Sequence, residues 1–381
     1  MLDKLLKERA LPPLLTQADG TPVTDWRTRR AVLLTALETY SYGHTPPPPL
    51  RVWCEELEAP APFRRIYGGK VRQERLLLHF ETEHGVCRFP FVLALPLRVE
   101  KPPVLLHLAF RPDLPDKAVP VEEITDAGYA LAVVCYQDMV NDAHFGDFSD
   151  GIAAHFGTQN PRGPEEWGKI GMWAYGASRV LDYLLTRADI DAAHTAVVGH
   201  SRLGKTALWC AAQDERFWAA ASNDSGYGGA ATSKHGTGER VQDFVRVGSW
   251  DWFCENFKLF ADEKEDEKPY DQSWLLAMIA PRLLCVGSAV EDWAADPQSE
   301  FLTTLEASQV WERLGVPGLI TPDRLPEAGD VLQDGHISYH MRFGDHFLSR
   351  EDWNNYIRFF DRHLGRGRSE KNKTGGHPAA R

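Results

Sequence analysis

The stretch "VVGHSRLGKTALW", residues 197–209, matches two motifs that belong to different chemistries. From Gly199 to Thr206 it is G-x-x-x-x-G-K-T, the pattern of a P-loop whose backbone holds nucleotide phosphates. From Gly199 to Gly204 it is G-x-S-x-x-G, which is close to a nucleophile elbow with Ser201 at its tip. Both motifs join a strand to the helix that follows it, so the rest of the chain must decide between a nucleotide and an acyl-enzyme.

The segments around this stretch predict an α/β protein. Strand-type apolar runs, helical spacing and hairpin-like alternation follow one another along the chain. The predicted strands are 103–110, 129–136, 217–224 and 282–290, the predicted helices are 165–185, 203–214 and 350–364, and 65–97 reads as antiparallel hairpins. Strands that alternate with helices indicate a mostly parallel sheet with both faces covered. We expect one domain over residues 1–365, a solvated acidic loop at 262–268 and a disordered tail at 366–381.

Composition narrows the class of protein. Of the 381 residues, 43% are apolar and 25% are charged, which is typical of a globular protein. The net charge of -12 argues against a nucleic-acid partner, and no apolar run approaches the ~18 residues of a membrane span. The scattered cysteines contain no C-x-x-C pair, and the N-terminal residues show no secretory signal. We therefore expect a cytoplasmic protein, although a secreted one with its signal removed would show the same residues.

The order of the acidic residues and histidines decides between the two motifs. A P-loop needs an acid at the end of another strand to hold magnesium, and Asp292 lies well past the apolar core of its strand. An elbow needs an acid after a later strand and then a histidine. Asp224 or Asp292, followed by His346, supplies that order. The elbow is therefore the favoured interpretation, although Leu203 occupies a place where elbows have a small residue and glycine follows one position later.

Several motifs resemble one known family. "GHSRLGKTALW" resembles the G-C-S-R-x-G-K-x-A signature of the glucuronoyl esterases, carbohydrate esterase family fifteen. Segments similar to its bacterial branch follow in the same order, over roughly residues 20–364: "WGKIGMWAYGASRVLDYL", "NDSGYGGAA", "WFCENF", "PYDQSWLLAMIAPR", "EDWAADP" and "YHMRFGDHFLSREDW". The resemblance implies a three-layer αβα sandwich, the α/β-hydrolase fold. It also implies cleavage of esters between 4-O-methyl-glucuronic acid and lignin alcohols, without metal or cofactor.

The resemblance assigns Ser201 as the nucleophile and His346 as its base. A serine hydroxyl is a weak nucleophile, so it needs a base within hydrogen-bond reach. His346 matches the histidine of the family's G-K-H-D-V-T segment, whereas His336 and His340 lie in a predicted strand and are expected to be structural.

Two aspartates compete for the role of the acid. Asp224 in "NDSG" matches the glutamate of the family's E-S-G segment, and Asp292 in "VEDWAADP" follows the next predicted strand. Asp292 fits the usual hydrolase position better, so we favour it and keep Asp224 as the alternative.

Further residues match positions that the family uses to bind substrate. The backbone N–H and guanidinium of Arg202 are expected at the oxyanion, as the residue that follows a nucleophile. Lys205 resembles a lysine that binds sugar hydroxyls, Trp293 a tryptophan that packs on the sugar, and Glu239 a glutamate that accepts a hydroxyl. His200 replaces a cysteine that is often disulfide-bonded in the family.

The sequence therefore predicts a serine esterase that acts on a glucuronate ester through a Ser-His-Asp triad. A different carbohydrate esterase, such as a sugar or xylan deacetylase, is the alternative among enzymes. A catalytically silent carbohydrate-binding protein is the alternative from another class, and a nucleotide-binding protein comes last.

Overall fold

A computed structural model describes residues 1–57, 65–158 and 161–366, and its centre is an 11-stranded sheet. The order is β1-β3-β4-β6-β5-β7-β8-β9-β11-β10, with β2 paired to β3. The strands from β6 to β11 in that order run parallel, while β1, β3, β4 and β10 form antiparallel edges. The strands are β1 Arg51–Glu56, β2 Arg65–Ile66, β3 Val71–Thr82, β4 Gly85–Pro96, β5 Pro103–Ala109, β6 Ala130–Cys135, β7 Asp191–His200, β8 Ala219–Asn223, β9 Leu283–Ala289, β10 Val331–Leu332 and β11 Ile337–Arg342.

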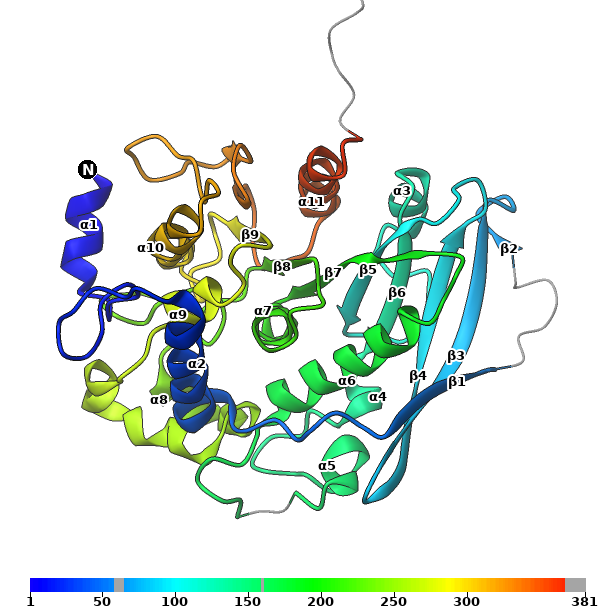
Figure 1. The fold of residues 1–381 in the computed structure, drawn as a ribbon, viewed down its shortest axis with the longest axis horizontal. Coiled ribbons are helices and arrows are strands. Elements are labelled where there is room, and N and C mark those ends of the chain that lie inside the picture. The colour runs from blue at the N-terminus through cyan, green and yellow to red at the C-terminus, as the bar shows by residue number, and fades with distance from the viewer. Residues whose placement is uncertain (58–64, 159–160, 367–381) are drawn as a thin grey trace, which may run out of the picture.

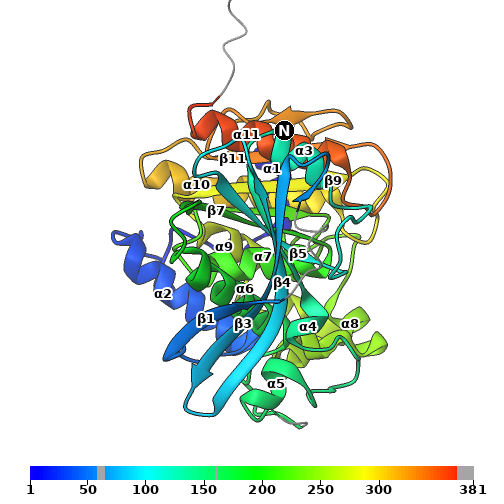
Figure 2. The ribbon, with the colours of Figure 1, turned by 90° about the vertical axis from the view of Figure 1, so that its right-hand side faces the viewer.

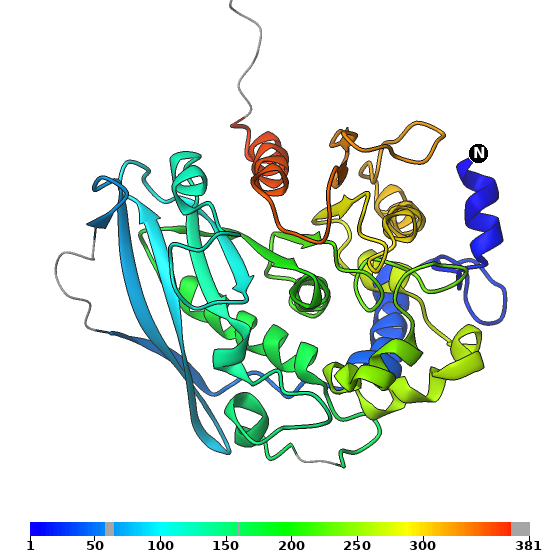
Figure 3. The ribbon, with the colours of Figure 1, turned by 180° about the vertical axis from the view of Figure 1, so that it is seen from behind.

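Helices cover both faces of this sheet, which confirms the predicted three layers. In Figure 1, α3 and α11 lie on one face and α6 and α7 on the other, and Figure 3 shows the same arrangement from behind. The helices are α1 Leu2–Arg9, α2 Trp26–Leu37, η1 Glu38–Tyr42, α3 Val121–Asp126, α4 Tyr136–Met139, α5 Gly151–His155, α6 Lys169–Leu184, α7 Arg202–Gln213, α8 Val241–Val247, η3 Ser249–Trp252, η4 Glu255–Phe260, η5 Asp262–Glu267, α9 Gln272–Ala277, α10 Pro297–Arg313 and α11 Arg350–His363.

The central strands are buried on both faces because their side chains alternate between two cores. Every residue of β5, β6, β9 and β11 is buried, as expected for parallel strands beneath two helical layers. Leu106 and Leu284 join the core with α6 and α7, whereas Leu105 and Cys285 join the core with α3 and α11. In Figure 2, which faces the edge of β1, β3 and β4, the strands behind lie at progressively different angles, the usual twist of a sheet.

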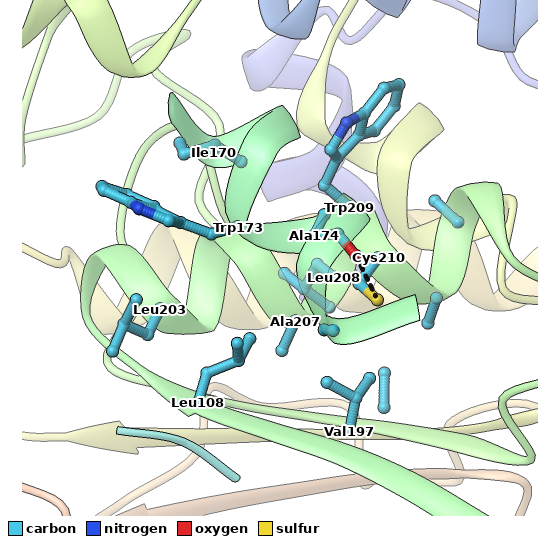
Figure 4. Packing of buried hydrophobic residues seen from close by; sticks show 14 of the residues in the cluster. Leu108, Ile170, Trp173, Ala174, Val197, Leu203, Ala207, Leu208, Trp209 and Cys210 are labelled. Atoms are coloured by element: carbon cyan, nitrogen blue, oxygen red, sulfur yellow. Dashed lines mark hydrogen bonds between the residues drawn. The ribbon is translucent and has the colours of Figure 1, made fainter. Parts of the chain in front are cut away.

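The packing of α6 against α7 fixes the helix that follows the elbow. Figure 4 shows Ala174 of α6 beside Leu208 and Cys210 of α7. The Cys210 thiol donates a hydrogen bond to the Ala174 carbonyl at 3.5 Å. A methyl group at Gly176 would lie 2.1 Å from the Met139 sulfur, so glycine at this position lets α6 pack closely against α4 as well. The helix α6 therefore packs against both α7 and α4.

Two segments differ from the sequence predictions. The acidic stretch 262–268 forms the short helix η5 instead of a loop; Asp262, Lys264, Asp266 and Glu267 are exposed, as predicted, but Glu265 and Lys268 are buried. Lys268 donates to the Tyr227 hydroxyl at 3.0 Å, and Glu265 accepts from Arg240 at 2.6 Å. The predicted tail, 366–381, lies outside the described residues from 367 onward. Among the residues that the structure covers, no helix has the length and apolar character needed to cross a bilayer.

Candidate active site

Ser201 lies at the sharp turn between β7 and α7. Its φ of 58° and ψ of -129° are unusual for a residue with a side chain, as in a strained strand-to-helix elbow. Its N–H donates to the Asn223 carbonyl at the end of β8 at 2.9 Å. A Cβ at Gly199 would lie 1.9 Å from the Leu203 carbonyl, and one at Gly204 would lie 2.9 Å from Ser222 Oγ. Glycine at these two positions therefore allows the strand and the helix to approach closely, and the Leu203 side chain can be buried in the core.

Lys205 does not have the environment that a P-loop lysine needs. Its side chain is buried, and Nζ donates to the Ser225 carbonyl at 2.7 Å and to Glu239 Oε2 at 2.9 Å. A P-loop lysine instead reaches the phosphates of its nucleotide. The geometry of this stretch is that of an elbow.

His346 and Asp292 meet at the carboxyl ends of the parallel strands, where Ser201 also lies. His346 follows β11 and Asp292 follows β9, and these strands run parallel to β7 and β8. His346 Nδ1 and Asp292 Oδ2 are 2.6 Å apart. Burial raises the pKa of Asp292, but the hydrogen bond and charge of His346 outweigh burial and hold that pKa below its usual range. Asp292 is therefore an ionised acceptor that fixes one nitrogen of His346 and leaves the other for a hydroxyl.

Asp224, the alternative acid, lies beside this pair but has a different partner. It follows β8, is buried, and its Oδ2 accepts from Arg342 Nη2 at 2.9 Å. Oxygens of Asp224 and Asp292 and a ring nitrogen of His346 all lie within 4.8 Å of one another. These groups include metal-ligand types, yet one carboxylate is hydrogen-bonded to the imidazole and the other to a guanidinium. The structure brings both candidate acids to His346 and pairs only Asp292 with it.

The competing histidines lie elsewhere. His340 is buried in β11, and its Nε2 is 2.8 Å from Asp352 Oδ1. His336 precedes β11 and packs its ring 5.0 Å from that of His363. Both environments are those of structural histidines.

His200 connects the elbow to the loop that carries His346. The two imidazole centroids are 4.4 Å apart, and His200 Nδ1 is 2.6 Å from Asn223 Oδ1. Burial, helped by the nearby His346, lowers the pKa of His200 to about 3. His200 therefore stays uncharged near neutral pH and packs against His346 without repelling it.

The Arg202 guanidinium is clamped beside Ser201. It forms an ion pair with Asp142, and its Cζ lies 4.5 Å from the centre of the Trp252 ring. Asp142 also accepts from Trp252 Nε1 at 2.8 Å and from the Tyr136 hydroxyl at 3.0 Å. Sequence reasoning missed Asp142 and Trp252, because nothing local in "MVNDAHFGD" or "SWDWF" signals a partner for an arginine.

A buried ion pair holds the loop that carries Asp142. Lys169 Nζ and Asp251 Oδ2 are 3.1 Å apart with both side chains fully buried. Lys169 also donates to the Ala143 carbonyl, and Asp251 accepts from the Gly146 N–H at 3.2 Å. Burying a charge costs free energy unless the charge is paired, so Lys169 and Asp251 are held together. Through their bonds to Ala143 and Gly146 they fix the loop at two points.

The remaining predicted residues lie around the elbow and the turn after β9. Lys205 and Glu239 form the ion pair described above, and the Glu239 side chain is 35% exposed. Trp293 directly follows Asp292 and is 80% exposed, which leaves its indole face open to a ligand. It is the only exposed residue among the twelve tryptophans, all of which the described ranges include.

Glu300, at the start of α10, is a buried carboxylate that the sequence analysis did not identify. It accepts from the Ser225 N–H at 2.8 Å, the Gly226 N–H at 3.0 Å and the Ser288 hydroxyl at 2.6 Å. These bonds hold the turn after β8, next to Asp224. Burial raises the pKa of Glu300 to about 7, against the lowering effect of those donors.

This raised pKa predicts that stability falls with rising pH. Because the folded-state pKa of about 7 exceeds the usual 4.5, the contribution is complete below about pH 4.5 and disappears as pH rises through 7. A shift of this size corresponds to about 3 kcal/mol. Glu300→Gln should therefore flatten the pH dependence of the unfolding free energy, measured with urea between pH 5 and 8. Glu312→Gln, an exposed change on the same helix, is the control, and equal pH slopes in both variants would contradict the assignment.

Comparison with known proteins places this geometry in a family. The family model described as "Glucuronyl esterase, fungi" matches residues 161–315. Carbohydrate esterase MZ0003 from an unknown prokaryotic organism is 33% identical, over 94% of this chain and 90% of that protein. A 4-O-methyl-glucuronoyl methylesterase of Schizophyllum commune is 29% identical, over 81% of this chain and 74% of that protein.

Solved structures agree with these relatives. The glucuronoyl esterase from Solibacter usitatus superposes with a TM-score of 0.81 at 34% identity, covering 92% of this chain and 96% of that one. A promiscuous CE15 esterase from a marine bacterial metagenome superposes with a TM-score of 0.80 at 32% identity, covering 93% and 96%. The chain therefore belongs to the glucuronoyl esterases, carbohydrate esterase family fifteen, a family of carboxylic ester hydrolases with the α/β-hydrolase fold.

Proposed function

We propose that this protein is a serine esterase that hydrolyses the ester of 4-O-methyl-glucuronic acid with an alcohol, using Ser201, His346 and Asp292. The observation that carries the proposal is the 2.6 Å contact between His346 and Asp292 at the sheet edge where the elbow presents Ser201. Ser201 Oγ attacks the ester carbonyl while His346 Nε2 takes its proton, and His346 then protonates the departing alcohol. Water, activated by His346, hydrolyses the resulting acyl-enzyme, and Asp292 orients the imidazole throughout.

Two groups of Arg202 are suited to the tetrahedral oxyanion. Its backbone N–H is at the first position of α7, where a helix has no carbonyl partner for it. Its side chain is 28% exposed next to the elbow, so part of the positive charge of the guanidinium can face the ester. The Asp142 and Trp252 contacts hold the guanidinium before substrate arrives, and donors fixed in advance stabilise developing charge most effectively.

The substrate class is inferred from Lys205, Glu239 and Trp293. The Lys205–Glu239 pair offers a donor and an acceptor to sugar hydroxyls, and the open Trp293 ring offers an apolar face to a pyranose. The relatives named glucuronoyl esterase and 4-O-methyl-glucuronoyl methylesterase support a uronic acid as the acyl part.

A panel of esters tests this function. The purified protein should hydrolyse benzyl glucuronate with a higher kcat/KM than acetylated xylan or a chromogenic acetate. The reverse preference would make it a sugar deacetylase. Binding of the glucuronate ester without turnover would indicate a silent carbohydrate-binding protein, and magnesium-dependent ATP binding would restore the P-loop interpretation.

Lys205 should control substrate choice, whereas Arg202 should not. Lys205→Ala removes a charge-assisted hydrogen bond to the sugar, worth about 1.5–3 kcal/mol, which acetate cannot use. Selectivity for benzyl glucuronate over a chromogenic acetate should therefore fall about tenfold or more. Arg202→Ala should slow both esters, because the oxyanion is common to them. Ratios of kcat/KM for both variants decide this, and equal slowing of both esters by Lys205→Ala would assign Lys205 a structural role.

We further propose a reducing compartment, in keeping with the predicted cytoplasmic location. All six cysteines lie within the described residues and are unpaired, and five of them are buried. Disulfides are rare where glutathione and thioredoxin keep thiols reduced. Fractionation of the source cells, with detection by antibody, tests the location, and recovery outside the cytoplasm would contradict it.

A further inference from the structure

Arg342, the last residue of β11, is the hub of a buried polar cluster next to the candidate site. It is 4% exposed. Its Nε donates to Asp352 Oδ2 at 3.0 Å, and its Nη2 donates to Asp224 Oδ2 at 2.9 Å. One guanidinium thus joins the carboxylate beside His346 to the Asp352 carboxylate in the first turn of α11.

The same guanidinium holds the backbone on both sides of His346. It donates to the carbonyls of Phe343 at 3.0 Å and Asp345 at 2.9 Å, and also to the carbonyl of Phe347. Asp345 and Phe347 are the immediate chain neighbours of His346. The His346 side chain is 45% exposed and its imidazole contacts His200 and Asp292, so the backbone of its loop must fix the rest of its position.

The loop is also tied to the turn that carries Asp292. The Val290 N–H donates to the Arg342 carbonyl and the Glu291 N–H to the Gly344 carbonyl, each at 3.0 Å. The two members of the His346–Asp292 pair therefore lie on turns that are fastened to each other and to Arg342. A shift of about 1 Å in such a pair is enough to slow catalysis by about a hundredfold.

Only a guanidinium can serve all these acceptors. Arginine has five N–H donors in a rigid planar fork, whereas lysine has three donors around one point. Arg342 also supplies the positive charge between Asp224 and Asp352. Burial raises the pKa of Asp224, and Arg342 opposes that rise, so without Arg342 this acid, which lies within 4.8 Å of His346 and Asp292, would lose its charge. Lysine at this position would keep the charge and lose the hold on the loop.

We propose that Arg342 is a positioning residue that sets the geometry of His346 by binding the backbone carbonyls on either side of it. This inference rests on the proposed function, because it requires His346 to be the base. Arg342 touches no substrate and acts only through His346.

The test combines burst kinetics with a double-mutant cycle. With 4-nitrophenyl acetate, Arg342→Lys should lower the acylation rate about 10- to 100-fold and leave the burst amplitude, which counts folded sites, unchanged. In a His346→Ala background the same change should alter the residual rate less than twofold, because the group it positions is already gone. Arg342→Met, which also removes the charge, should be slower still.

Arg282→Lys is the matched control. Arg282 is another guanidinium bound to backbone carbonyls, those of Phe217 at 2.9 Å and Ala211 at 2.7 Å. It directly precedes β9, so it lies at the amino ends of the parallel strands, opposite to the candidate site. It should lower the melting temperature without changing the acylation rate.

Two results overturn the inference: an unchanged acylation rate in Arg342→Lys, or an equal fold loss with and without His346. A smaller burst amplitude at an unchanged rate would show a structural role only. If His346→Ala alone retains full activity, the proposed function fails instead, so the two failures are distinguishable.

Discussion

Ser201→Ala is expected to lower kcat/KM for benzyl glucuronate by about 10⁴-fold or more. Alanine removes the only atom that can form the acyl-enzyme, so the remaining rate reflects the oxyanion donors and substrate binding alone. The fold should persist, because the elbow is fixed by the two glycines and by the Ser201 N–H, none of which the change removes.

Steady-state hydrolysis, melting temperature and ester binding should be measured together. The variant should still bind benzyl glucuronate, since the proposed contacts of Lys205, Glu239 and Trp293 remain. Retained turnover in a folded Ser201→Ala protein would exclude the serine mechanism.

Asp292→Asn should be nearly as damaging, with a loss of about 10⁴ in kcat. The asparagine amide would donate toward His346 Nδ1 and favour the tautomer with its proton on Nε2, which cannot accept the Ser201 proton. Asp224→Asn should cost less than about tenfold, because its remaining oxygen still accepts from Arg342 and no bond to His346 is lost.

The comparison needs both variants under the same conditions, with kcat, KM and melting temperature for each. Equal folding with a large difference in kcat would identify Asp292 as the acid. If Asp292→Asn keeps nearly full activity while Asp224→Asn is inactive, the role of the acid belongs to Asp224.

The parts of the fold that local patterns determine could be predicted from the sequence. Strands such as 103–110 and 129–136 are continuous apolar runs, and a buried parallel strand requires that pattern. The elbow was visible because glycines at fixed offsets are needed where Gly199 and Gly204 approach neighbouring backbone and side-chain atoms. The order of acid and histidine followed from the strand order, and the structure places Asp224, Asp292 and His346 together.

Residues whose partners lie far along the chain could not be predicted. Arg342 and Asp224 are 118 positions apart, and Arg202 and Asp142 are 60 apart. Neither pair leaves a local pattern, because only the parallel sheet brings its members together. In the acidic stretch 262–268 the exposed charges agree with the prediction, whereas the burial of Lys268 could not be predicted because its partner Tyr227 is 41 positions away.

The contact between His200 and His346 determines how this protein should respond to its surroundings. Where a relative joins its elbow by a disulfide, reductants can cut that link, but two imidazoles in contact, with ring centroids 4.4 Å apart, contain nothing to reduce. Hydrolysis should therefore be indifferent to dithiothreitol and to the thiol balance of the cell. The same contact is weaker than a covalent bond, so the histidine loop is expected to loosen at a lower temperature than the sheet beneath it.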